Sequence, residues 1–306
     1  MKFNLFLLVV LCFTLESCFL FEKPEPPIDP PVIEETVSFV DTPDAFPIQR
    51  GLVDEASGLV ASRIIENGLW VHQDGNNQPD LYLINKQAAL LGKWRLPFEN
   101  RDWEDIAWGI DPVNKNNYLY IADTGDNAVQ YNEYYIYRFL EPKSIDDGIG
   151  GLEKFSFKYT GGTTNSYNSE ALLVDPATGD IYIITKEGFN VSVFRMTYPQ
   201  STTTVNDANF LGTIPYFNIV GADISADGKE ILMKSYPAIY FWKRKENESI
   251  YSALSRSRDV SPAYEIERQG EAIGFDKEQN GFYTLSERAE GPQVSLRYYG
   301  KIKSDK

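Results

Sequence analysis

The chain has 306 residues, of which 24% are charged, 42% hydrophobic and 14% aromatic, enough to form the core of one large domain or two small ones. Its 44 acidic residues outnumber its 29 basic residues and give a net charge of −15. This balance argues against a protein that binds nucleic acid by neutralising the phosphate backbone. The 18 Phe, 19 Tyr and 5 Trp exclude disorder over most of the length.

The N-terminus has the pattern of a signal peptide. Lys2 precedes an apolar run over residues 3–15, and a small residue, Ser17, is followed by Cys18. A charged start, a short apolar core and a small residue before a cleavage point are typical of secretory signals. Because a cysteine follows, the pattern resembles the bacterial lipoprotein signal, in which that cysteine is lipidated. A plain signal peptide or a short membrane anchor is the alternative.

This resemblance implies a signal peptide over residues 1–17, lipidation of Cys18, and an extracytoplasmic protein on the bacterial cell envelope that touches the membrane through its lipid anchor only. Residues 18–35 are rich in proline, which favours an extended chain and predicts a tether. Cys12 lies in the apolar run, so the mature domain contains no cysteine beyond Cys18. Disulfides, thiol catalysis and zinc sites built from cysteine are therefore excluded.

From residue 36 onward, short apolar or alternating runs separated by Gly, Asn, Asp and Pro predict an all-β domain over residues 36–303. A unit of roughly fifty residues recurs, a period typical of propeller blades. Each unit opens with small and apolar residues beside an acidic one and continues with an aromatic-rich strand. The predicted first strands cover residues 55–59, 104–107, 170–174, 221–225 and 271–275.

Four antiparallel strands recurring at this period predict a β-propeller. Five blades are favoured, and six remain open because the second repeat carries an insertion. Predicted outer strands include residues 93–96, 155–159, 209–212 and 263–266. The last repeat ends after three strands, so an N-terminal strand over residues 36–40 is expected to close the ring. A β-sandwich is the rival fold, but it does not explain the recurring strand order.

In a propeller, the start of the first strand and the end of the second meet on one face, around the central axis. The residue pairs expected to meet there are Glu55 with Asp74, Glu104 with Asp123, Glu170 with Lys186, and Glu271 with Glu287. Asp102, Asp126 and Asn127 are predicted on the same face. His72, the single histidine, is a further candidate, either as a base beside Asp74 or as a plain polar residue.

Carboxylates gathered in a narrow channel repel one another, and burial makes each charge less favourable. Three solutions are open. The acids can accept backbone hydrogen bonds and tie the blades together, pair with Lys186, Lys234 or Arg63, or bind a hard cation, for which Ca²⁺ is the candidate cofactor. Some of the acids can also stay protonated.

The order of these motifs over residues 55–287 resembles an uncharacterised group of secreted bacterial β-propeller (lipo)proteins. More distantly, the acidic channel is similar to phytase-like and gluconolactonase-type propellers, a likeness that implies channel carboxylates holding Ca²⁺. The resulting expectation is a module that binds a small molecule, a glycan or an envelope protein through an acidic axial face. The alternative is a calcium-dependent hydrolase of esters, lactones or phosphoesters, with the ion as Lewis acid.

Overall fold

The computed structural model describes residues 37–302, except residues 187 and 289–292. The predicted signal peptide, the lipidated Cys18 and the tether over residues 18–35 lie outside the described residues. No helix in the described part of the chain combines the length and hydrophobicity that crossing a bilayer requires.

The strands follow one another in groups that form antiparallel sheets. The first three groups have four strands each: β2 (Ala56–Ala61), β3 (Gly68–Gln73), β4 (Asp80–Asn85) and β5 (Leu90–Arg95); β6 (Trp103–Ile110), β7 (Asn117–Asp123), β8 (Tyr134–Leu140) and β9 (Glu153–Thr160); β10 (Ser169–Val174), β11 (Ile181–Thr185), β12 (Val191–Met196) and β13 (Asn206–Ile214).

The remaining groups are β14 (Ile219–Ile224), β15 (Glu230–Ser235) and β16 (Ile239–Lys243), then β17 (Gly270–Phe275), β18 (Gly281–Ser286) and β19 (Ser295–Gly300), with β1 (Asp44–Pro47) added beside β19. A short helix, α1 (Ile250–Ser255), follows β16. Its N-cap is Ser249, whose side chain accepts a hydrogen bond from the backbone N–H of Ser252.

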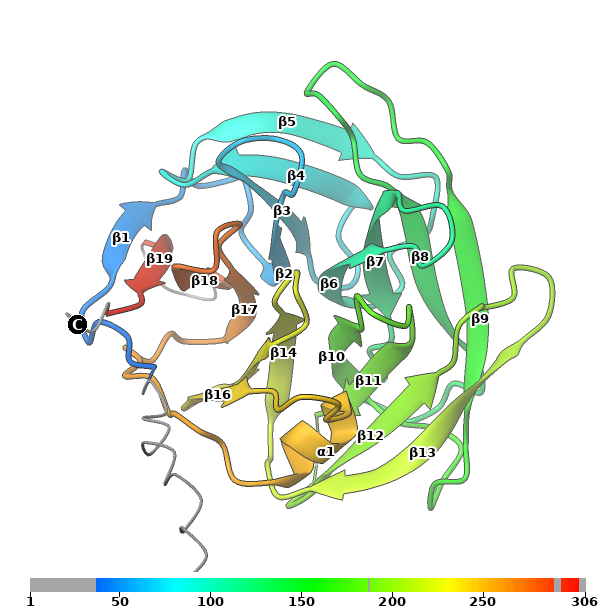
Figure 1. Cartoon of the computed structure of the whole chain (residues 1–306). Coiled ribbons are helices and arrows are strands. Elements are labelled where there is room, and N and C mark those ends of the chain that lie inside the picture. The colour runs from blue at the N-terminus through cyan, green and yellow to red at the C-terminus, as the bar shows by residue number, and fades with distance from the viewer. Residues whose placement is uncertain (1–36, 187, 289–292, 303–306) are drawn as a thin grey trace, which may run out of the picture. The chain divides into compact units, whose positions relative to one another are not determined.

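The first strand of each group lies innermost, and the sheets radiate outward from a common axis (Figure 1). The inner strands β2, β10, β14 and β17 are buried along their whole length because sheets cover both of their faces. Apolar side chains of successive sheets interlock between them, as Leu83 and Trp70 of the first group do with Ile121 of the second. This is the arrangement of a β-propeller, as the repeat predicts.

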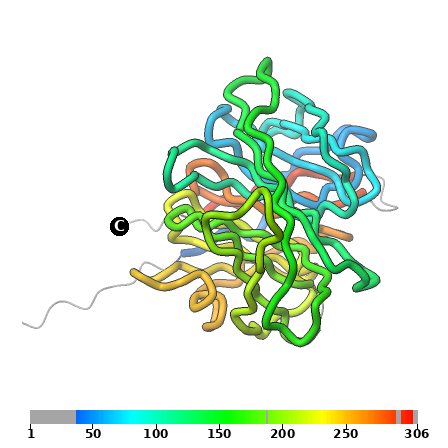
Figure 2. The backbone as a smooth tube through the Cα atoms, turned by 90° about the vertical axis from the view of Figure 1, so that its right-hand side faces the viewer, coloured from blue at the N-terminus to red at the C-terminus, as the bar shows by residue number. Residues whose placement is uncertain are grey.

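Three features differ from the sequence prediction. β9 pairs with β13 in parallel, so the second and third groups of strands join into one mixed sheet of eight strands. Figure 2 shows the molecule from the side on which β9 and β13 lie. Residues 263–266 form no strand, and the sheet of β14, β15 and β16 has three strands. Residues 36–40 contribute an isolated bridge between Phe39 and Lys301, while the strand beside β19 comes later, at Asp44–Pro47.

Every inner strand has a shift in register near its beginning, where one extra residue is inserted against the second strand. Such a bulge bends the strand and leaves the extra residue unpaired in the ladder. The inserted residues are Ser57, Glu104, Glu170, Val220 and Glu271. Three of the five are glutamates, and the bulge therefore determines where the acidic side chains of the axial face lie.

Candidate functional site

The three bulge glutamates share one buried acidic environment. Glu104, Glu170 and Glu271 are all almost fully buried. Burial raises the pKa of Glu104 well above its usual value, and the charges of Glu170, Asp74 and Glu271 raise it further. Burial likewise raises the pKa of Glu271. The bulges thus bring together acids that are more than a hundred and sixty residues apart in sequence (271 − 104 = 167).

Asp74, Asp102 and Glu104 form the densest part of this environment, which we call the open triad. Each offers one carboxylate oxygen, and these oxygens lie within 4.8 Å of one another. Two glycines make the convergence sterically feasible. A Cβ at Gly125 would overlap the carboxylates of both Glu104 and Asp102, and a Cβ at Gly75 would overlap that of Asp102.

Glu104 is 3% exposed. Within the described part of the chain, neither a hydrogen bond nor an ion pair reaches the carboxyl oxygens of Glu104 or Asp102. Asp74 accepts a hydrogen bond from the backbone N–H of Gly75 at 2.6 Å. Burial and the nearby carboxylates of Asp102 and Glu55 raise its pKa to about 6. The open triad therefore carries negative charge that the described residues leave without a direct counter-ion.

Glu170 and Glu271 lie in a different setting, in which the residues that directly follow β11 and β15 interact with their carboxyl groups. The Lys186 ammonium lies 2.5 Å from Glu170 Oε1, and Tyr236 donates a 2.7 Å hydrogen bond to Glu271 Oε1. The Lys186 ammonium also lies 5.2 Å from the centre of the Tyr236 ring. Burial opposes the charge of Lys186, but the attraction of Glu170 outweighs it and raises the lysine pKa. We call these four residues the lysine cluster.

Two other buried acids connect the inner strands. The carboxylate of Asp105 accepts backbone hydrogen bonds from Ile106 at 2.9 Å, Leu172 at 2.8 Å and Ala222 at 3.2 Å, which links β6, β10 and β14. Asp223 accepts from Ile224 at 2.8 Å and from Phe275 at 2.7 Å, linking β14 to β17. Acids that link neighbouring blades through backbone hydrogen bonds are one of the three possibilities in the sequence analysis, and these two aspartates form such links.

Three other residues predicted near Glu104, two aspartates and an asparagine, make hydrogen bonds within their own surroundings. Asp123 accepts hydrogen bonds from the Asp102 backbone at 2.9 Å and the Tyr137 hydroxyl at 3.0 Å. Asp126 accepts from two backbone N–H groups of its loop and from the Tyr134 hydroxyl. Asn127 is exposed and accepts a hydrogen bond from the Asn168 side chain. None of the three belongs to the open triad.

Glu55 and Glu287 lie together at the rim. They form an isolated bridge between the first and last groups of strands. Glu55 is exposed and accepts a 2.5 Å hydrogen bond from Asn77, whereas Glu287 accepts one from Gln269 at 2.8 Å. Burial and the charge of Glu271 raise the pKa of Glu287 to about 8.

His72 and Lys234 are buried inside the protein. His72 is fully buried, its Nδ1 lies 3.1 Å from the Gln73 carbonyl oxygen, and its ring meets Trp103 edge to face. Burial lowers the pKa of His72 to about 4, so the ring is neutral at physiological pH. The Lys234 ammonium donates to the backbone carbonyl of Gly270, and burial lowers its pKa to about 8.

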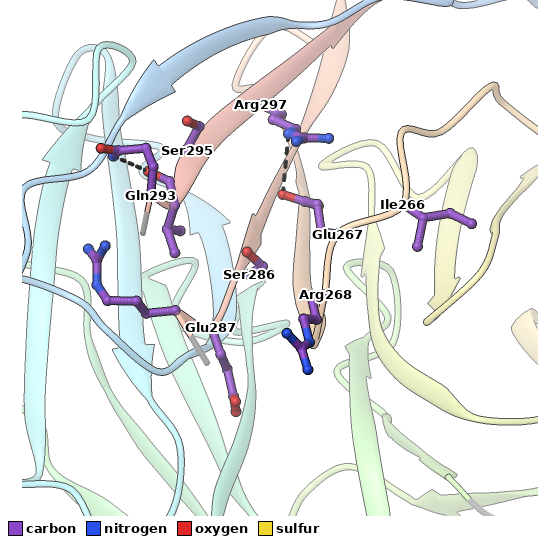
Figure 3. A pocket seen from close by; sticks show the side chains of 10 residues that line it. Ile266, Glu267, Arg268, Ser286, Glu287, Gln293, Ser295 and Arg297 are labelled. Atoms are coloured by element: carbon purple, nitrogen blue, oxygen red, sulfur yellow. Dashed lines mark hydrogen bonds and ion pairs between the residues drawn. The ribbon is translucent and has the colours of Figure 1, made fainter. Parts of the chain in front are cut away.

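A cavity of about 150 Å³ lies beside the rim, near the beginnings of β17 and β19. Figure 3 shows Glu267 pointing toward Arg297, with Glu287 pointing away from that pair. Glu267 lies 3.7 Å from the Arg297 guanidinium and accepts a hydrogen bond from Tyr264. Glu267 in this cavity is therefore paired with an arginine, whereas the acids of the open triad have no such partner in the described residues.

The register of the sheets shows which positions correspond between repeats. The residues directly after the second strands are Asp74, Thr124, Lys186, Tyr236 and Glu287. The repeats compared by sequence alone predict Asp123 at the position that Thr124 occupies, and they do not indicate Tyr236. They also match Glu55 to Glu104, although Ser57 holds the bulge position in the first repeat. The signal that would have found Tyr236 is its place immediately after a second strand, the same as that of Lys186.

The open triad offers oxygen ligands only, from three carboxyl groups, and its donors suit Ca²⁺ or another hard divalent cation. Such an ion would offset the repulsion between the acids and would interact with Glu104, which the described residues leave without a partner. The donor set therefore fits the calcium that the sequence analysis suggested.

No family model matches the chain, and no curated protein matches it. Among solved structures it is similar to one described as the structure of the Dos1 propeller, at 12% identity and a TM-score of 0.38. That match covers 79% of this chain and 68% of the other.

Proposed function

We propose that this protein is a β-propeller binding module whose axial face holds a divalent cation, with calcium as the preferred ion, between Asp74, Asp102 and Glu104. The cation then offers its remaining coordination positions to a ligand, which can be a small molecule, a glycan or a protein of the cell envelope. This proposal combines the predicted acidic binding face with the predicted calcium ion.

One observation carries the proposal: the Glu104 carboxyl group is buried without a described partner, and its oxygen converges with those of Asp74 and Asp102. Buried charges in proteins are normally paired or bound to a metal. The glycines at positions 75 and 125 leave space at the point of convergence. A cluster that only stabilised the fold would accept backbone hydrogen bonds, as Asp105 does.

The test is a calcium titration of the full chain after treatment with a chelator, followed by calorimetry and thermal melting. At a hundredfold excess of calcium over Kd, binding to the native state alone adds about 2.7 kcal/mol, which corresponds to a rise in Tm of about 5–10 °C. Gly125→Ala should abolish that rise, because the new methyl group would overlap the carboxylates of Glu104 and Asp102.

Gly148→Ala is the matched control, because a Cβ at position 148 meets no atom within 4 Å. This variant should respond to calcium as the wild type does. If calcium and chelator leave the wild-type Tm unchanged, the proposed function is wrong.

We further infer that the propeller has five blades. The inner strands contact one another in chain order, and β17 contacts β2. The first and last groups also share a core that contains Leu59 and Tyr283, and the Arg288 guanidinium pairs with Asp54 at 2.6 Å. β1 pairs with β19 in an antiparallel manner and supplies the outer strand of the last blade. Deleting residues 37–48 should therefore lower Tm, and an unchanged Tm would contradict closure by this segment.

The proposal places the module on the bacterial cell envelope through a lipid at Cys18. The support is the sequence pattern of residues 1–18 and the proline-rich run that follows. Cys18→Ala expressed in bacteria should shift the protein from the membrane fraction to the soluble fraction. If the variant stays with the membranes, lipid anchoring at Cys18 is wrong.

A further inference from the structure

The Lys186 ammonium is a cation fixed beside the buried acids of the axial face. Lys186 directly follows β11, and its backbone N–H donates to the Asn168 carbonyl at 3.0 Å, which fixes the start of the side chain. The side chain is 18% exposed, so most of its aliphatic part is covered by protein, while its ammonium reaches Glu170 Oε1 at 2.5 Å. The ammonium thus occupies a position where a carboxylate-lined channel could otherwise hold a metal ion.

The lysine cluster extends this compensation across the axis. Tyr236 presents its ring to the Lys186 ammonium and its hydroxyl to Glu271. The compensated acids therefore come from β10 and β17, whereas the acids of the open triad come from β6 and from loops that follow β3 and precede β6. The axial face is divided into a half that contains a lysine and a half that does not.

The two halves nevertheless share one electrostatic field. The Lys186 ammonium attracts the Asp74 carboxylate. It attracts the Asp102 carboxylate as well. The charge of Lys186 is therefore felt at the open triad, although the ammonium pairs with Glu170.

We propose that Lys186 is a specificity-determining residue that acts as a fixed cation in one half of the axial face. It limits the axial face to a single divalent ion and lowers the affinity of the open triad for that ion. This inference rests on the proposed cation site. It follows from Coulomb's law, because a fixed ammonium repels a divalent ion held nearby and neutralises the glutamate that could bind a second one.

The experiment compares calcium binding to wild-type protein and to Lys186→Met by calorimetry on the full chain. Met keeps an unbranched side chain of similar length without the charge. The wild type should bind one calcium ion. Lys186→Met should bind two, the second between Glu170 and Glu271, and the affinity of the first site should rise about tenfold.

Lys93→Met is the control for a general loss of positive charge, because Lys93 pairs with Asp80 on the first group of strands. It should bind one calcium ion with wild-type affinity. Lys186→Met leaves Glu170 buried without its ammonium, so a second variant, Lys186→Met combined with Glu170→Gln, protects the test against poor folding. This double variant should bind one ion and keep only part of the tenfold gain in affinity, because it also removes the negative charge of Glu170, which acts on Glu104.

The outcomes separate the two proposals. One ion with unchanged Kd in both Lys186 variants would overturn the role of Lys186 and leave the calcium site standing. Absence of calcium binding in the wild type and in every variant would overturn the proposed function and this inference together. A gain in affinity that Lys93→Met reproduces would also overturn the inference, because general electrostatics would then explain it.

Discussion

Glu104 and Asp105 are neighbours on β6, and both are almost completely buried, but their surroundings differ. Asp105 accepts backbone hydrogen bonds from three inner strands. Glu104 meets the carboxylates of Asp74 and Asp102. The bulge between Trp103 and Asp105 produces this contrast, because it inserts Glu104 into the strand opposite no residue of β7.

The contrast shows that the role of a buried carboxylate in this protein depends on the hydrogen-bond donors around it and not on how deeply it is buried. Asp105 and Asp223 accept hydrogen bonds from backbone N–H groups that the strands hold in place, so their role is structural. Glu104 has no such donors in the described residues, and an ion from solution would serve in their place. The following predictions test this division between structural and ligand-binding acids.

The largest effect is expected for Asp105→Ala. The substitution leaves the N–H groups of Ile106, Leu172 and Ala222 buried without this acceptor, which should lower the free energy of unfolding by about 3–5 kcal/mol. Urea denaturation in the presence of chelator measures it. Asp105→Asn keeps one acceptor oxygen and should lose about 1–2 kcal/mol. A loss below about 1 kcal/mol for the alanine variant would show that the tie is dispensable.

Glu104→Gln should have the opposite effect on the apo protein. The amide has nearly the same shape and removes a carboxyl group whose pKa burial raises. The free energy of unfolding at pH 8 in chelator should therefore rise by about 1–2 kcal/mol. The same variant should lose the calcium-induced rise in Tm. If Glu104→Gln destabilises the apo protein and still responds to calcium, the contrast with Asp105 is wrong.

The pH dependence of stability offers a third test through His72. Its pKa falls from an ordinary 6.5 to about 4 on burial, so folding favours the neutral ring. This contribution is complete above pH 6.5 and is lost as pH falls toward 4. Between pH 8 and pH 5 it amounts to about 2 kcal/mol. The stability difference between wild type and His72→Asn should shrink by this amount, since the carboxyl groups are common to both proteins. A constant difference would mean that His72 is not held neutral.

The all-β fold and the order of the strands within each repeat could be predicted from the sequence, because alternating apolar residues and turn signals recur in each repeat. The five bulges could not, since an inserted residue leaves no separate mark on the apolar pattern. One residue of shift reverses the direction of every side chain that follows. The repeats aligned by their acidic residues match Glu55 with Glu104, although Ser57, two residues further along, is the corresponding residue.

Long-range packing sets the other limits of prediction. Residues 263–266 alternate like a strand but form none, and the backbone of Glu265 instead donates to the Tyr299 hydroxyl at 3.1 Å. The parallel pairing of β9 with β13 depends on two sheet edges that meet only in the folded protein. The open triad likewise depends on Gly75 and Gly125, whose importance is visible only once the carboxylates beside them are placed.

The smallest effect is expected for Glu55→Gln, which tests this correspondence directly. Glu55 is exposed, accepts a hydrogen bond from Asn77, and lies outside the open triad. Its charge acts on Asp74 through a rim where solvent and salt screen it, so the calcium Kd should change by no more than about threefold. Asp102→Asn removes one of the three converging carboxylates and should weaken calcium binding by about a hundredfold under the same conditions. Equal losses in the two variants would place the ion at the rim beside Glu55 and Glu287, and the bulge would then no longer explain where the cation binds.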